Sequence, residues 1–175
     1  MFKRNIMITK EKINALLNEE IIAAKKLFSG PWAHEPLLTA NMFQHKRYLG
    51  LANSSGEISI NSLFLNTSAI ELLSNTLRHE ICHLIVGVQQ NHNSKFKRVA
   101  SILGVKDNDE FKELTLITSQ IKYKYSVVAH MAGGKKVELG GVHRKTKKYT
   151  EYDPKGRRKM RIDGVLIERF EFLNN

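Results

Sequence analysis

The sequence predicts an α+β fold, with a mainly helical body and a small β-hairpin over residues 1–120, followed by a basic β-meander over residues 121–175. In the first part, long segments carry apolar residues at helical spacing. In the second part, short runs rich in β-branched and aromatic residues alternate with turn residues. The charge changes at the same point, because the first part has 14 basic against 11 acidic residues (+3) and the second has 14 against 6 (+8).

The body begins with an amphipathic helix, expected over residues 9–28, where the apolar residues share one face. Gly30 and Pro31 follow and end it. A β-hairpin is expected over residues 48–60, because two partly alternating segments there flank a polar, glycine-containing turn at residues 53–56.

The second long helix is expected to begin at a capping box formed by Ser68 and Glu71, and to run to about Gln90. It is apolar over much of its circumference, which predicts a central and largely buried helix. Shorter helices are expected over residues 94–103 and 107–120.

The meander contains two expected strands within residues 123–139. Asp163-Gly164 lies between two apolar segments and predicts a two-residue hairpin turn. We also expect residues 149–152 to pair with residues 159–162 across an intervening turn.

No apolar stretch approaches the roughly 20 residues that cross a bilayer, and the N-terminus lacks the apolar run of a secretory signal. An intracellular, cytoplasmic protein without a membrane partner is therefore expected. The single cysteine, Cys82, excludes an intramolecular disulfide and a cysteine-rich zinc module.

The segment His79-Glu80-Ile81-Cys82-His83 fits the pattern H-E-x-x-H and lies inside the expected buried helix. Four residues advance a helix by about 6 Å and rotate it by only ~40°, so both imidazoles face one side and can hold one metal ion. Zinc is the natural occupant, and Glu80 then lies beside its open position, where it can accept a proton from water. The motif predicts a zinc hydrolase.

A third protein ligand is needed, and three residues are candidates. The metzincin pattern is excluded, because Val86 and Gln89 stand where that pattern needs glycine and histidine. Glu110 or Glu113 would complete a thermolysin-like site. His92 is favoured over both, because it lies nine residues beyond His83 and imidazole is the commonest partner in zinc sites.

These residues resemble the SprT-like (Spartan-type) zinc metalloprotease family. Residues 77–84 look like its active helix, residues 92–96 like its segment with a third histidine and an aromatic residue, and residues 47–61 like its preceding hairpin. The resemblance covers about residues 9–105. It implies a zincin-like core over residues 1–120, zinc held by His79, His83 and His92, Glu80 as general base, and cleavage of DNA-bound proteins as in crosslink repair.

The sequence departs from the family in two places. Asn93 replaces the usual glycine after the third histidine, which is mild because asparagine visits left-handed backbone geometry more readily than most residues. Many members also have a four-cysteine zinc ribbon after the catalytic part, whereas residues 121–175 contain no cysteine. A second, structural zinc is therefore not expected.

The basic meander favours a polyanionic partner, and nucleic acid is the one we expect. The candidate nucleic-acid-binding residues form two clusters in the sequence. The first consists of Lys145, Lys147 and Lys148, and the second of Arg157, Arg158 and Lys159. The preferred interpretation is a metalloprotease acting on DNA-associated proteins. Two alternatives stay open: a nucleic-acid-binding protein with a structural or inactive zinc site, and a peptidase with a soluble substrate and no DNA role.

Overall fold

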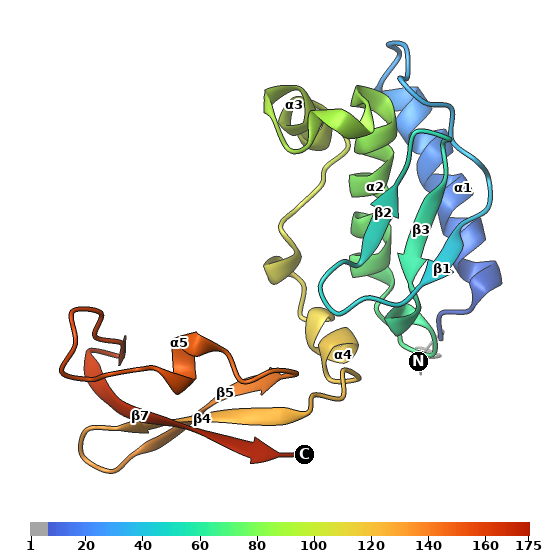
Figure 1. Ribbon diagram of the computed structural model, residues 1–175. Helices are drawn as coiled ribbons and strands as arrows, with labels where there is room; N and C mark the ends of the chain where they lie inside the picture. The colour runs from blue at the N-terminus through green and yellow to red at the C-terminus, as the bar shows by residue number, and fades with distance from the viewer. Residues whose placement is uncertain (1–6) are drawn as a thin grey trace, which may run out of the picture. The chain divides into compact units, whose positions relative to one another are not determined.

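The computed structural model describes residues 7–175, and within them the fold is α+β, with five α-helices and two small sheets (Figure 1). The chain divides into two compact units, Met1–Gln120 and Ile121–Asn175. The expectation of an α+β fold is confirmed. No helix of the described residues combines the length and apolar character needed to cross a bilayer.

The first helix, α1, spans Lys10–Leu27, as its periodicity predicts. The Thr9 hydroxyl accepts a hydrogen bond from the Lys12 N–H at 3.2 Å and so caps its first turn. Its apolar face is buried in the core of the first unit, beside α2 (Figure 1). The buried residues of α1 are Ile13, Leu16, Leu17, Ile21 and Ala24.

The central helix, α2, spans Ile70–Val86 and is buried along most of its length. The expected capping box is wrong, because Ala69 is the N-cap residue and no side chain caps the helix from that position. The Leu72 N–H instead donates to the Glu113 carboxylate at 2.7 Å. A carboxylate from a distant segment therefore satisfies one of the free N–H groups at the start of this helix and suits the positive end of its dipole.

The C-terminal end of α2 comes earlier than the sequence predicts. Gly87 has a φ of 96°, a geometry that side-chain-bearing residues rarely adopt, and the helix ends before it. A short 3-10 turn, Val88–Gln90, follows. Asn91 has a φ of 49°, so the chain changes direction twice within five residues and returns toward α2.

The first sheet has three short strands in the order β1-β3-β2: β1 (Asn41–Phe43), β2 (Gly50–Ala52) and β3 (Ile58–Asn61). β2 and β3 form the predicted antiparallel hairpin. β1 pairs with β3 in parallel and was not predicted, because three residues are too few to show alternation. Ile58 and Ile60 are fully buried, and β2 is the edge strand that contacts α2.

After α2, helix α3 spans Ser94–Ile102, close to its predicted range. The continuous helix expected over residues 107–120 is wrong, since the structure has a 3-10 turn, Asn108–Glu110, and then the short helix α4, Leu114–Thr118. Phe111 lies between them in extended geometry (φ −96°, ψ 115°), which breaks the helical hydrogen-bond series.

The second unit is built on one antiparallel sheet in the order β5-β4-β7-β6. Its strands are β4 (Tyr125–Met131), β5 (Lys136–Val142), β6 (Arg161–Ile162) and β7 (Val165–Asn174). Asp163 and Gly164 both have positive φ (49° and 79°) and form the turn between β6 and β7, as the dipeptide predicts.

The pairing expected between residues 149–152 and 159–162 is wrong. Residues Lys147–Thr150 form a single helical turn, α5, and β6 pairs with β7 instead. The Tyr152 hydroxyl links the segment between α5 and β6 to strand β7. It donates to the Ile167 carbonyl at 2.8 Å and accepts from the Met160 N–H at 3.1 Å.

Candidate metal centre

The candidate centre begins on α2, where His79 and His83 lie one helical turn apart with ring centroids separated by 5.1 Å. Both side chains are half-buried. The turn after α2 brings His92 back toward them, so that its ring centroid lies 4.9 Å from that of His79 and 5.0 Å from that of His83. His92 is exposed, so the centre opens to solvent on this side.

The three histidines have ring nitrogens that all lie within 4.8 Å of one another. The Nε2 atoms of His79 and His92 are 3.0 Å apart. Nitrogen ligands of zinc bind at about 2.0–2.1 Å, which puts two ligands of a tetrahedral ion about 3.3 Å apart. The donor set and spacing therefore fit a single zinc ion. Within the described chain, the buried Nδ1 atom of His83 has no hydrogen-bond partner.

The imidazoles of His79 and His83 are held in the neutral form that binds metals. Burial, with smaller contributions from the neighbouring His83 and His92, lowers the pKa of His79 to about 4. Burial and His92 lower the pKa of His83 to about 4 in the same way. Near pH 7 both rings therefore keep a free lone pair for a cation.

Phe96, on α3, supports all three histidines. Its ring centroid lies 4.9 Å from that of His79, 4.5 Å from His83 and 4.7 Å from His92, and its side chain is only 5% exposed. The Asn93 side chain accepts hydrogen bonds from the Lys95 and Phe96 N–H groups and so fixes the start of α3. No separate role was expected for Phe96, although its aromatic ring four places after His92 was the available signal.

Glu80 follows His79 on α2 and is rotated about 100° around the helix from it. Its side chain is 6% exposed and packs toward Gly50 of β2. Burial alone raises the pKa of this carboxyl to about 8. A carboxyl so far removed from solvent binds protons unusually well, which suits a group that accepts and releases a proton.

The two other candidate ligands lie elsewhere. Glu110 accepts a hydrogen bond from the Asp107 N–H at 3.3 Å, and Glu113 caps α2 at Leu72. Leu72 is seven residues before His79, which corresponds to about 10 Å along the helix axis. The structure therefore brings His92, and neither glutamate, to His79 and His83.

Cys82 lies in the same helix but is fully buried in the core. Burial, with a smaller effect from Glu80, raises the pKa of its thiol to about 12. The thiolate is the form that binds metals, and a thiol with this pKa stays protonated near pH 7. Cys82 is therefore a core residue and not a candidate ligand.

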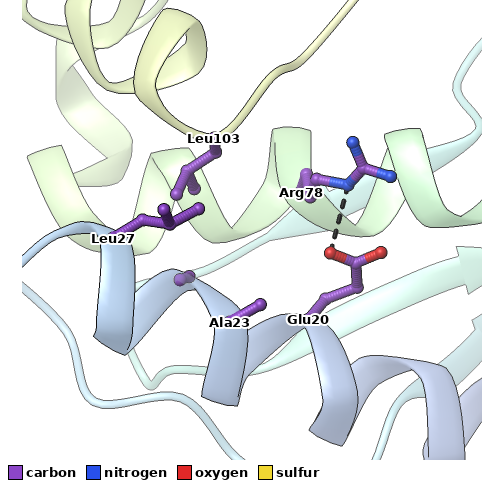
Figure 2. Close-up of a pocket in the computed structure, with 6 residues that line it drawn as sticks. Glu20, Ala23, Leu27, Arg78 and Leu103 are labelled. Carbon is purple, nitrogen blue, oxygen red and sulfur yellow. Dashed lines mark ion pairs between the residues drawn. The ribbon is translucent and has the colours of Figure 1, made fainter.

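Arg78, immediately before His79, anchors α2 to α1 on another face of the helix. Its Nε lies 3.1 Å from a carboxylate oxygen of Glu20, as Figure 2 shows. The pair lines a pocket of about 170 Å³ together with Ala23, Ala24, Leu27 and Leu103. None of the three histidines lines this pocket, so it is a feature of the helix packing that is separate from the candidate centre.

Four of the six candidate nucleic-acid-binding residues line one pocket of about 660 Å³ in the second unit, although the expected strand pairing is absent. These four residues are Lys147, Lys148, Arg157 and Arg158. Lys145 lies outside it, with its Nζ 5.2 Å from the centroid of the Tyr125 ring, and Lys159 is exposed. Glu151, which also lines the pocket, lies 3.7 Å from the Lys147 Nζ.

The model of the SprT-like family matches residues 15–116, which is more than half of the chain. The matched segment runs from α1 into α4 and contains all three histidines and Glu80. No curated protein and no solved structure matches the chain. The resemblance found in the sequence is confirmed, and the chain belongs to the SprT-like family.

Proposed function

We propose that the protein is a zinc-dependent endopeptidase of SprT-like type that cleaves DNA-associated proteins. The observation that carries this proposal is the convergence of three histidines from α2 and the following turn, next to a buried glutamate on α2. Because the proposed substrates are bound to DNA, we also propose that the protein acts inside the cell, in the cytoplasm.

In this proposal His79, His83 and His92 hold zinc. Zinc bound there supplies a Lewis acid that polarises the scissile carbonyl and lowers the pKa of an attacking water. Glu80 accepts the proton of that water on its carboxylate and passes it to the leaving amide nitrogen. Its burial supports this role, because a carboxyl with a raised pKa holds the transferred proton better than an exposed one.

Two features favour a catalytic over a structural zinc site. Structural sites are usually closed by four protein ligands, whereas three histidines converge within the described residues and the third is exposed. Glu80 also has no function in a purely structural site, and burying an unpaired carboxyl there destabilises the fold.

The DNA part of the proposal rests on the second unit. Four cationic side chains surround one pocket, and the unit's formal charge of +8 comes from 14 basic and 6 acidic residues. Lysine and arginine in such a cluster contact phosphate oxygens without reading sequence. The unit would therefore hold the protease on DNA whatever the local base sequence.

A protease assay on the purified full chain tests the proposal. The substrates are an unstructured casein-like protein and a basic protein bound to DNA, each with and without single-stranded DNA, and Glu80→Gln is the inactive control. We expect cleavage that requires Glu80 and increases with DNA. Cleavage that DNA does not change would identify a peptidase for soluble substrates, and DNA binding without any cleavage would identify a binding protein.

A further inference from the structure

Gly50, in the edge strand β2, lies directly against the side chain of Glu80. A Cβ atom added at Gly50 would be 2.8 Å from Glu80 Cγ, 2.8 Å from Glu80 Oε1 and 2.9 Å from Thr76 Cγ2. Carbon atoms in contact normally stay about 3.5–4.0 Å apart, so any side chain at this position would displace one of these groups.

The backbone at this position does not itself require glycine. The φ angle of Gly50 is not positive, and the residue pairs with Ile60 in the regular antiparallel register of β2 and β3. Any residue can adopt that extended conformation. The space taken by Glu80 and Thr76 is therefore the local reason for a residue without a side chain.

The strand cannot easily move away to make room. Ile60, opposite Gly50, is fully buried in the core. The Asn61 N–H donates to the Leu49 carbonyl at 2.9 Å, and the Asn61 side chain donates to the Tyr48 carbonyl at 2.7 Å. These contacts fix the backbone just before Gly50.

Thr76 is also fixed, because its hydroxyl donates to the Leu72 carbonyl at 2.8 Å and so holds its methyl group in place. The more movable partner is the Glu80 side chain, because its Cγ and Oε1 atoms belong to a flexible side chain rather than to the backbone. A side chain at position 50 would thus move the carboxylate while leaving the rest of the fold largely intact.

We propose that Gly50 is a positioning residue: the bare backbone of β2 holds the Glu80 carboxylate at the place from which it acts. This inference rests on the proposed function for its catalytic meaning. The geometric part, that position 50 sets the position of the Glu80 side chain, applies whatever the reaction.

The test compares the full-length wild type with Gly50→Ala. The matched control is Leu51→Ala, which changes the next residue of the same strand, whose side chain is 44% exposed. Four quantities are measured: zinc per chain, the thermal unfolding midpoint, kcat and KM on an unstructured protein substrate, and the position of the Glu80 carboxylate in crystal structures.

We expect Gly50→Ala to keep the zinc, the wild-type KM within about twofold and the unfolding midpoint within a few degrees, while kcat falls by about 10- to 100-fold, as a displacement near 1 Å can cause. The crystal structure should show a displaced carboxylate, and Leu51→Ala should behave as wild type. Wild-type kcat, an unmoved carboxylate, or activity that falls only in step with zinc or folding would overturn the inference. If the wild type cleaves nothing, the proposed function fails, and the two crystal structures still decide the role of Gly50.

Discussion

His79 and His92 are thirteen residues apart in the chain, and their Nε2 atoms lie 3.0 Å apart. The approach depends on the end of α2 at Gly87 and on the second turn at Asn91, both of which have positive φ. Two of the candidate ligands therefore come from one helix and the third from a turn, which leaves His92 at the open side of the candidate centre.

Replacing His92 should weaken zinc binding sharply. His92→Ala removes one of three ligands, so we expect zinc affinity to fall while α2 and the core remain folded. Zinc analysis after dialysis measures this, with Glu110→Ala as the control that keeps its zinc. Glu113→Ala should also keep zinc but lower the free energy of unfolding by about 1 kcal/mol, because the Leu72 N–H loses its partner. Zinc loss in either glutamate variant with retention in His92→Ala would favour a thermolysin-like site.

Replacing Glu80 by glutamine should separate metal binding from chemistry. The amide is almost the same size but cannot accept the proton of the attacking water, so Glu80→Gln should keep zinc and fold while proteolysis falls by about 10²- to 10⁴-fold. Removing an unpaired buried acid should leave the unfolding midpoint unchanged or raise it. Steady-state proteolysis, zinc content and thermal unfolding measure the three effects. Undiminished cleavage would exclude Glu80 as the base.

Phe96→Leu should reduce zinc affinity more than its effect on stability explains. Leucine keeps apolar volume but removes the ring that contacts all three imidazoles, so the ligands lose their common support. Removal of such supporting groups lowers metal affinity by roughly 10- to 100-fold. Competition with a chelator measures the affinity. Val99→Ala, which truncates another buried residue of α3, is the control for general loosening of the packing and should retain nearly wild-type affinity.

The basic pocket should bind DNA through its charges. In the test variant, serine replaces Lys147, Lys148, Arg157 and Arg158. For each DNA phosphate that the variant no longer neutralises, the plot of log affinity against log salt should flatten by about one unit, with zinc content unchanged. Lys135→Ser with Lys136→Ser removes charge from the same unit outside the pocket and should change the slope less per charge. Equal affinities and slopes for wild type and test variant would show that this pocket does not bind DNA.

Tyr152→Phe should destabilise the second unit without affecting zinc. The change leaves the Ile167 carbonyl and the Met160 N–H without their hydroxyl partner, which should lower the free energy of unfolding by roughly 1–3 kcal/mol. The apolar core of this unit is small, so the effect should be visible as faster amide hydrogen exchange in β6 and β7. Unchanged exchange there would show that the hydroxyl bridge is dispensable.

The parts of the fold that follow from local sequence were predictable. The apolar spacing of α1, the hairpin of β2 and β3, and the common face of His79 and His83 each depend on residues close together in the chain. Local patterns also gave a reason to favour His92, because its short distance from His83 limits where its ring can lie.

Contacts between distant segments could not be predicted in the same way. The cap of α2 comes from Glu113, 41 residues after Leu72, so the local Ser68 pattern was misleading. The contact of Gly50 with Glu80 joins a strand to a helix, and nothing in either segment alone shows it. Residues 149–152 were expected to pair as a strand across the following turn, whereas the Thr150 and Glu151 N–H groups donate to the Thr146 and Lys147 carbonyls and close a helical turn.

The most direct test of the central claim is a crystal structure of the zinc-loaded protein, with anomalous scattering measured at the zinc edge. We expect one zinc peak per chain, with ring nitrogens of His79, His83 and His92 at about 2.0–2.1 Å and the Glu80 carboxylate beside the fourth position without coordinating. A peak that lacks His92, one that has Glu110 or Glu113 as a ligand, or zinc bound away from α2 would contradict it.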